Sequence, residues 1–413
     1  MKLTKDAKNA VMIGGLCSAS YLAVYFARNI LSAVTPQIVD SNDATVEYIG
    51  IVSSLYFIFY AVGQLINGII GDKIKAKYMI AFGLLLAGAT NFAFPYVFAY
   101  QNAAKFIYAM TGFFLSMIYA PMTKVVAENT NPIHAVRCSL GYEVAALLGS
   151  PFAGIVASFL VWESVFRVGS IALVLMAVLC MIFFIYFERK GIVQYGKYEI
   201  RKEAERESSS LISGIKVLVK HRIITFSLIA IITGVVRTAV VFWLPTYFSQ
   251  YLGYDARVAP TIFTVATLII AMSAFIAVFV YERLKRNMDL TILLMFSLSS
   301  LFFLGVYLVK NPVINVGLII LAVLTSNCSA AMLWSRYCPS LRDTGMVSSA
   351  TGFLDFLSYM AAAASSSLFA NSVSTIGWGN LILIWMGLML FGVVIMLPYK
   401  RIFKLTEQKE KTI

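Results

Sequence analysis

Runs of about 20 apolar residues recur along the whole chain, separated by short polar breaks. A run of this length crosses the ~30 Å hydrocarbon core of a bilayer as an α-helix, whereas a membrane β-barrel would show ~10-residue segments of alternating polarity. The runs are continuous, so we predict an all-α polytopic membrane protein with twelve transmembrane helices. We expect these spans at residues 10–37, 47–70, 78–99, 104–127, 138–160, 165–187, 223–250, 257–281, 289–309, 313–335, 346–370 and 377–398.

The composition and the charge pattern agree with this topology. Charged residues make up only 13% of the chain, against about 25% in a typical soluble domain. Most Lys and Arg residues fall in alternate loops and in the two terminal segments, which by the positive-inside rule predicts cytoplasmic termini in an inner or plasma membrane. Topology therefore explains the net charge of +13, and we expect the lipid bilayer, not a nucleic acid, as the partner of the basic residues.

A long hydrophilic stretch after the sixth span divides the chain into two sets of six helices. We expect an N-terminal half over 1–187, a cytoplasmic linker over 188–222, and a C-terminal half with a cytoplasmic tail over 223–413. The five cysteines form no CxxC pair, and both histidines fall in or beside predicted loops. We therefore expect no disulfide, no metal site and no cofactor.

Two arginines interrupt the apolar runs at matching places in the two halves. Arg28 and Arg237 lie on the first predicted helix of each half, and each is followed eight positions later by a proline. A guanidinium at membrane depth costs about 2.5 to 3.5 kcal/mol and needs an anionic partner. The pattern indicates a central site that accepts a small anionic substrate. Pairing of each arginine with a buried carboxylate is the alternative, and the two roles are compatible.

Two acidic residues also fall at membrane depth, Glu143 on the fifth span and Asp355 on the eleventh. These spans occupy matching places in the two halves, so the acids could face the same central region as the arginines. Three roles stay open: balancing the arginine charges, carrying a proton, or hydrogen bonding to neighbouring hydroxyls and amides.

The loop between the second and third spans, GIIGDKIKAK, resembles the signature loop of the major facilitator superfamily. Gly68 would allow close helix packing, Asp72 would receive a basic residue or a helix end, and Lys73 would hold the loop at the anionic leaflet. An ordinary positive-inside loop is the alternative. The resemblance implies two pseudo-symmetric six-helix halves and a monomeric protein.

Several segments are similar to the organophosphate:phosphate antiporter family, in particular YLAVYFARN, RTAVVFWLPTYF, YAPMTK and ATGFLDFLSY. The resemblance implies that Arg28 and Arg237 bind the phosphate of the substrate while the two halves rock around it. Tyr25 and Tyr21 lie one and two turns before Arg28, respectively, and are candidate ligands. Lys124 ends the third of these segments, and we assign it to the cytoplasmic gate.

The chain also departs from that family. Gln64 stands where the glycerol-3-phosphate transporter has a lysine, and Ala145 stands where it has a histidine, so Gln64 is our candidate contact to the substrate. Tyr119 and Tyr359 could also donate hydroxyls, but in a chain with 22 Tyr and 30 Phe we expect most aromatic residues to serve in packing or at the membrane interface.

Together these features predict a secondary transporter that moves an organic phosphate or related small organic anion by alternating access, with exchange for inorganic phosphate implied by the resemblance alone. The runner-up is proton-coupled symport of an organic anion or zwitterion through Glu143 or Asp355. A membrane sensor of phosphorylated sugars is a third alternative, since some relatives in the family bind without transport. We expect no enzyme, because no catalytic constellation is visible at membrane depth.

Overall fold

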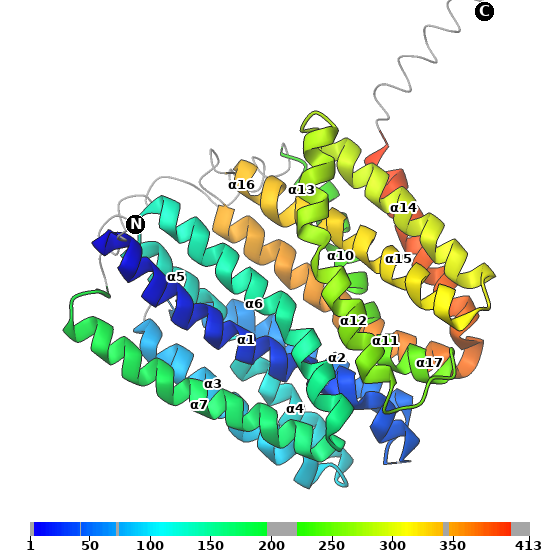
Figure 1. Ribbon diagram of the computed structural model, residues 1–413, viewed down its shortest axis with the longest axis horizontal. Coiled ribbons are helices and arrows are strands. Elements are labelled where there is room, and N and C mark those ends of the chain that lie inside the picture. Colours follow the sequence, from blue (N-terminus) through cyan, green and yellow to red (C-terminus); the bar gives the residue numbers. More distant parts are fainter. Residues whose placement is uncertain (1–3, 42, 72–73, 196–220, 342–346, 398–413) are drawn as a thin grey trace, which may run out of the picture.

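The computed structural model describes residues 4–41, 43–71, 74–195, 221–341 and 347–397 (Figure 1). For some helical residues, Glu143 among them, it describes the backbone only. Much of the expected linker over 188–222 and most of the expected tail lie outside the described residues, as do Asp72 and Lys73 of the signature loop.

Every described element of regular structure is a helix. The first six spans are formed by α1 (Lys5–Asp40), α2 (Val46–Gly71), α3 (Ala76–Val97), α4 with α5 (Gln101–Leu115, Tyr119–Asn129), α6 (Pro132–Phe159) and α7 (Trp162–Arg189). The last six are formed by α10, η1 and α11 (Ile223–Gly234, Val235–Val240, Val241–Gln250), α12 with α13 (Ala259–Ala271, Ser273–Arg283), α14 (Met288–Leu308), α15, η2 and α16 (Pro312–Met332, Leu333–Tyr337, Cys338–Ser340) and the bent α17 (Val347–Met396).

Local sequence explains several helix boundaries. Asn131, Asn287 and Asn311 each cap a helix, accepting hydrogen bonds from backbone N–H groups of the first turn through the side-chain oxygen. Gly377 has φ 76°, a left-handed conformation that favours glycine, and it divides α17 into the last two spans.

The twelve predicted spans are confirmed as helices. Within the described residues, ten helices are long and apolar enough to cross a membrane, and one of these, Gly352–Met396, contains the bend and supplies two spans. The remaining predicted span corresponds to α6, whose described apolar part is Val144–Phe159.

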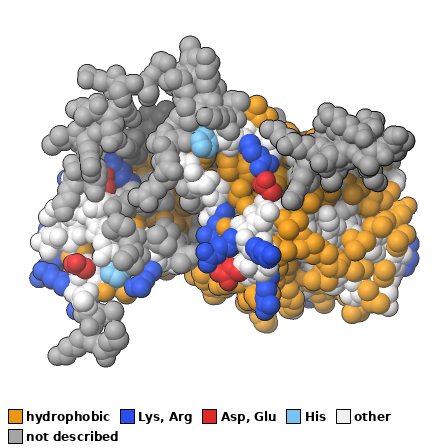
Figure 2. Space-filling view, turned by 90° about the horizontal axis from the view of Figure 1, so that it is seen from above, with side chains coloured by type: hydrophobic (Ala, Val, Ile, Leu, Met, Phe, Trp, Pro, Cys, Tyr) orange, Lys and Arg blue, Asp and Glu red, His pale blue; other side chains and the backbone are white. Residues whose placement is uncertain are grey.

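The two sets of six helices lie largely on opposite sides of the molecule (Figure 1). Helix α1 begins and α17 ends on the same side, which we call the terminus side, and we call the opposite side the far side. Figure 2 shows the terminus side, where Lys and Arg side chains gather around the helix ends. Across the interface between the halves, α2 packs on α17, α6 on α12 and α1 on α11.

Candidate anion-binding site

Four aromatic residues surround the Arg28 guanidinium on α1. The Arg28 Cζ atom lies 4.8 Å from the ring centroid of Tyr359, 5.1 Å from Tyr25, 5.2 Å from Tyr60 and 5.8 Å from Phe57. The Nη1 group also donates a 2.8 Å hydrogen bond to the Tyr359 hydroxyl oxygen. We call Tyr25, Phe57, Tyr60 and Tyr359 the aromatic cage.

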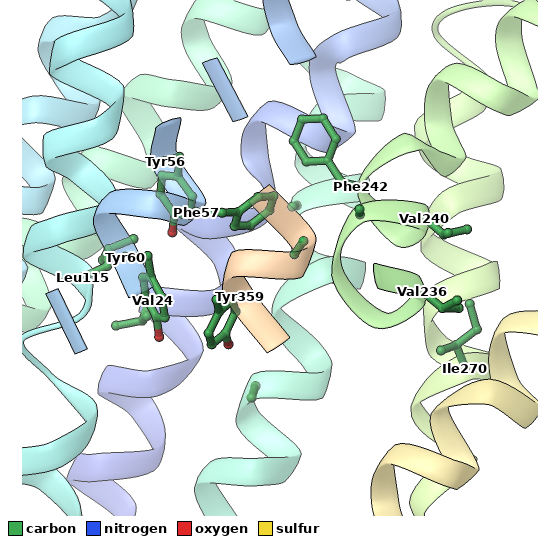
Figure 3. Close-up of a cluster of buried hydrophobic side chains, with 14 of the residues drawn as sticks. Val24, Tyr56, Phe57, Tyr60, Leu115, Val236, Val240, Phe242, Ile270 and Tyr359 are labelled. Atoms are coloured by element: carbon green, nitrogen blue, oxygen red, sulfur yellow. The ribbon is translucent and has the colours of Figure 1, made fainter. Parts of the chain in front are cut away.

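The cage is assembled where three helices meet. Figure 3 shows Phe57 and Tyr60 of α2 beside Tyr359 of α17. The Tyr60 and Tyr359 rings pack edge to face, with centroids 4.9 Å apart, and this contact crosses the interface between the halves. A cation–π contact in a desolvated place contributes about 2 kcal/mol. The rings therefore stabilise a partly buried arginine that has no described carboxylate within the ion-pair limit of 4.0 Å.

Arg237 lies in a different kind of environment. It is part of η1, a π-helical segment that interrupts an otherwise α-helical span between α10 and α11. Its Cζ atom lies 5.9 Å from the ring centroid of Trp334, which belongs to the second π-helical segment, η2. Single π-helical turns inside α-helices occur frequently at functional sites. The site thus uses two such segments on neighbouring spans.

Asp355 on α17 is the acidic residue that the structure brings to the arginines. It lies one turn before Tyr359 and interacts electrostatically first with Arg237 and then with Arg28. The electrostatic interaction with Arg237 depends on close packing of α10 against α17. A Cβ atom added to Gly234 would lie 2.4 Å from the Ser358 Oγ atom and 2.8 Å from the Ser358 Cα atom. Only glycine lets α10 approach α17 so closely, and Arg237 follows Gly234 by one turn.

The other predicted site residues lie at varying distances from this centre. Tyr25 is a member of the cage, whereas Tyr21 packs against Tyr25 with ring centroids 4.9 Å apart and does not itself lie over Arg28. Gln64 is partly buried on α2, one turn after Tyr60. The side chain of Glu143 lies outside the description, so its role stays a prediction.

The described residues assigned to the cytoplasmic gate, Gly68 and Lys124, lie toward the terminus side of their helices. Gly68 is near the end of α2, and Lys124 is partly buried on α5. The structure adds a charged cluster here, since Lys75 and Lys77 both form ion pairs with Glu188 at the end of α7. These pairs join α3 to α7 within one half, so they stabilise that half without crossing the interface.

Sequence reasoning missed Phe57, Tyr60 and Trp334, and considered Tyr359 without selecting it. Each is an ordinary aromatic residue in an apolar run, so its type carries no signal of function. One signal was available: Tyr359 and Tyr60 lie one turn from Asp355 and Gln64 respectively, and both of these polar residues stood out in the sequence.

Contacts between the halves concentrate toward the far side. The Ser32 Oγ donates a 2.5 Å hydrogen bond to the Phe242 carbonyl oxygen, the Ser54 Oγ donates a 2.6 Å bond to the Ala363 carbonyl oxygen, and Ser53 bonds to Ser366. These residues lie between Arg28 and the far ends of their helices. We call this set the far-side seal.

Two glycines add close helix contacts on the far side, which we include in the far-side seal: one joins α2 to α17 and the other joins α6 to α12. A Cβ on Gly50 would lie 2.3 Å from the Ala370 Cβ atom, and one on Gly154 would lie 2.2 Å from Thr264 Oγ1 and 2.8 Å from the Pro260 carbonyl oxygen. In the seventh span, α11 packs against α1, whereas α10 on the terminus side packs mainly on helices of its own half. The halves are therefore joined more tightly on the far side.

Comparison with known families agrees with this architecture. A family model of the Major Facilitator Superfamily matches residues 17–366, which is most of the chain. The chain belongs to the Major Facilitator Superfamily. It is a multi-pass membrane protein of a transporter family, which bears out the expectation that it is not an enzyme.

Curated relatives are more distant. The chain is 24% identical over 253 residues to membrane sensor protein UhpC of Salmonella typhimurium, covering 58% of this chain and 57% of that protein. It is 22% identical over 260 residues to UhpC of Escherichia coli strain K12, covering 60% and 59%. The matched region thus spans somewhat less than two thirds of these relatives. The match agrees with the resemblance to the organophosphate:phosphate antiporter family.

Solved structures share the fold. A D-xylose-proton symporter superposes with a TM-score of 0.72 at 12% identity, covering 94% of this chain and 97% of that one. A mutant form of the nucleoside transporter NupG gives a TM-score of 0.71 at 12% identity, covering 93% and 98%. At such identity these structures establish the two-half architecture and leave the substrate undefined.

Proposed function

We propose that the protein is a secondary transporter that moves an organic phosphate or related small organic anion by alternating access. The observation that carries the proposal is the convergence of two partly buried guanidinium groups, one from each half, on the same two residues of α17. Arg28 bonds to Tyr359, and Arg237 interacts electrostatically with Tyr359, Asp355 and Arg28. A guanidinium presents a rigid fork of N–H donors that fits phosphate or carboxylate oxygens in a bidentate manner.

Anion binding would link the halves through these groups. An oxyanion beside Arg28 can accept from the free N–H donors of that side chain and from the Tyr359 hydroxyl, whose oxygen already accepts from Arg28. The same anion can accept from Arg237 on the other half. Binding energy would then favour a state in which both halves close on the substrate, and release would allow them to reopen on the other side.

The far-side seal and the charge distribution support an orientation. Lys and Arg side chains gather on the terminus side, which the positive-inside rule assigns to the cytoplasm of an inner or plasma membrane (Figure 2). The far side would then face outward, and the structure would correspond to a state sealed toward the outside. We propose that the protein works as a monomer in this orientation.

The direct test is exchange in proteoliposomes preloaded with phosphate. Uptake of radiolabelled phosphate is measured in the presence of a panel of phosphate esters, and the best competitor indicates the substrate. We expect Arg28→Lys and Arg237→Lys each to lower exchange at least about tenfold, because a lysine ammonium cannot reproduce the bidentate contact. Absence of phosphate uptake by the wild-type protein would contradict phosphate exchange, and undiminished uptake in both variants would contradict the assigned site.

Alternating access has its own test at the far-side seal. Gly154→Leu places a side chain against Pro260 and Thr264 and should destabilise the sealed state by about 1 to 3 kcal/mol. Spin labels at Ser41→Cys and Gln250→Cys, two exposed helix-end positions, report the far-side distance by double electron–electron resonance. We expect longer distances in Gly154→Leu.

The matched control is Gly317→Leu, since no atom lies within 4 Å of a Cβ at that position. It should leave the distance distribution unchanged. Equal distributions in the wild type and in Gly154→Leu would contradict the role of this contact in the seal.

Proton-coupled symport is the second candidate, and the electrostatic interaction of Asp355 with both arginines favours it. A carboxylate there competes with the substrate for the guanidinium groups, so its protonation would release the arginines for the anion. Under this mechanism an inward proton gradient drives uptake of a labelled organic anion, and Asp355→Asn removes that dependence. Glu143 is the other predicted carrier and calls for the same experiment with Glu143→Gln.

A sensor is the third candidate, because the two UhpC relatives described above are named membrane sensor proteins. A sensor would bind the anion in equilibrium measurements yet fail to exchange it in proteoliposomes. Binding and exchange measured on one preparation therefore separate the two functions.

A further inference from the structure

A stripe of α15 and η2 next to Arg237 is partly exposed between fully buried neighbours. From Ala322 to Trp334, the partly exposed positions are Asn327, Ala331 and Trp334, and every other position is buried. Their spacing of four and three residues places them on one helix face. Trp334 lies over Arg237, so this face is turned toward the arginine site.

The stripe offers one stacking surface and one hydrogen-bonding group. The indole ring of Trp334 provides a broad apolar face, and η2 is the π-helical segment that presents it. Two turns away, the Oδ1 atom of Asn327 is buried and has no hydrogen-bond partner among the described residues. Ala331 lies between them, and its small side chain does not protrude from the helix face.

The unpartnered Asn327 Oδ1 atom is a hydrogen-bond acceptor at membrane depth, where it needs a donor. A buried polar atom without a partner costs about 1 to 3 kcal/mol in mutational measurements. The Oγ atoms of Ser326 and Ser329, on the adjacent turn of the same helix, are also buried without a described partner. This concentration of unsatisfied oxygens in one short segment of α15 distinguishes it from the far-side seal, where Ser32, Ser53 and Ser54 are all hydrogen-bonded.

We propose that Trp334 and Asn327 form a second subsite, which binds the uncharged part of the substrate while the arginines bind its anionic group. The inference rests on the proposed function and adds to it the shape of the ligand. The uncharged part has a ring with an apolar face for the indole and at least one hydroxyl or N–H donor for the Asn327 Oδ1 atom. Trp334 and Asn327 then determine specificity between anions that share a charged group but differ in the remainder.

The test compares three probes that share a phosphate group. Equilibrium binding of inorganic phosphate, glycerol 3-phosphate and glucose 6-phosphate is measured on the purified full-length chain. Because apolar contact in a pocket discriminates by factors of ten or more, we expect the ring ester to bind at least about tenfold more tightly than the open-chain ester. Trp334→Leu and, independently, Asn327→Ala should lower this ratio to about one.

A matched control distinguishes this effect from general damage. Trp378→Phe alters a buried indole of the same half, outside the stripe, whose Nε1 lacks a described partner, and it should preserve the ratio. Asn327→Ala removes little volume and serves where Trp334→Leu fails to fold.

Every other outcome contradicts a specific part of the subsite inference or of the proposed function. If phosphate binds but the two esters bind equally, the arginine site stands and the second subsite is wrong. A ratio that persists in both variants places recognition of the ring elsewhere. If none of the three anions binds, the proposed function fails, and the subsite inference fails with it.

Discussion

The two arginines occupy matching places in the two halves, yet their surroundings differ. Arg28 lies on the continuous helix α1, inside a cage of four rings, and bonds to Tyr359. Arg237 lies on a π-helical segment, contacts one described ring and has Asp355 as its electrostatic neighbour. Pseudo-symmetry of the fold thus places the two charges, and local packing gives each a separate means of stabilisation.

This difference suggests a division of roles. The cage fixes the position of Arg28, for which the described residues provide no ion pair within 4.0 Å, so we expect this guanidinium to be available to an anion. Arg237 interacts more strongly with the Asp355 carboxylate than Arg28 does, and an incoming anion must compete with that interaction. We expect Arg28 to set the strength of anion binding and Arg237 with Asp355 to determine how binding is coupled to movement or to a proton.

The largest expected effect is a difference between the two lysine variants. Arg28→Lys should lower phosphate exchange at least about 100-fold, because a lysine ammonium cannot contact four rings and Tyr359 at once and small misplacements of a binding group have effects of this size. Arg237→Lys should lower exchange about tenfold. Initial rates in proteoliposomes measure both. Equal losses would remove the proposed distinction.

The second prediction concerns the charge balance around Arg237. Arg237→Gln removes the stronger of the two arginine interactions of Asp355, and an unbalanced charge at membrane depth costs about 2.5 to 3.5 kcal/mol. Adding Asp355→Asn should recover most of the lost stability but none of the transport. Thermal unfolding in detergent follows the stability, and exchange assays follow the function.

The matched control for this pair uses the other arginine. Asp355→Asn combined with Arg28→Gln should recover less stability, because Arg28 is the weaker electrostatic neighbour of Asp355. The same recovery in both double variants would show that Asp355 does not distinguish the two arginines.

The sequence was sufficient to predict the charges but not their surroundings. Arg28, Arg237 and Asp355 were visible because a charged residue in an apolar run is conspicuous, and the transmembrane helices were visible because a bilayer requires long apolar runs. The cage depends on α2 and α17 meeting across the interface between the halves. No local pattern around Phe57 or Tyr60 indicates that contact.

The π-helical segments could not be predicted from the sequence either. Neither η1 nor η2 contains a proline or a glycine, the residues that usually announce a break in a helix. Gly234 immediately precedes η1, but its function becomes clear only with Ser358 of α17 packed against it. Sequence periodicity identifies the spans, whereas tertiary packing determines where their hydrogen-bond pattern changes.

The third prediction separates the hydroxyl groups of the cage from its rings. Tyr359→Phe keeps the ring but removes the 2.8 Å hydrogen bond from Arg28, and bonds to charged groups contribute about 1.5 to 3 kcal/mol. We expect anion affinity to fall at least about tenfold. Tyr60→Phe is the control, since Arg28 meets Tyr60 through the ring face. Similar affinities in both variants would assign the Tyr359 hydroxyl no special role.

The smallest effect should come from the most distant ring of the cage. Phe57 lies 5.8 Å from the Arg28 Cζ atom, near the ~6 Å limit of a cation–π contact, and has no hydroxyl, so Phe57→Leu removes the most distant of four such contacts and leaves three. We expect about a threefold loss of anion affinity. Trp334→Leu removes the single described ring over Arg237, at the similar distance of 5.9 Å, and should cost more because no other described ring replaces it. Phosphate binding to the two variants measures this difference directly. If Phe57→Leu proves as damaging as Trp334→Leu, the cage acts as one cooperative unit and not as a set of separate contacts.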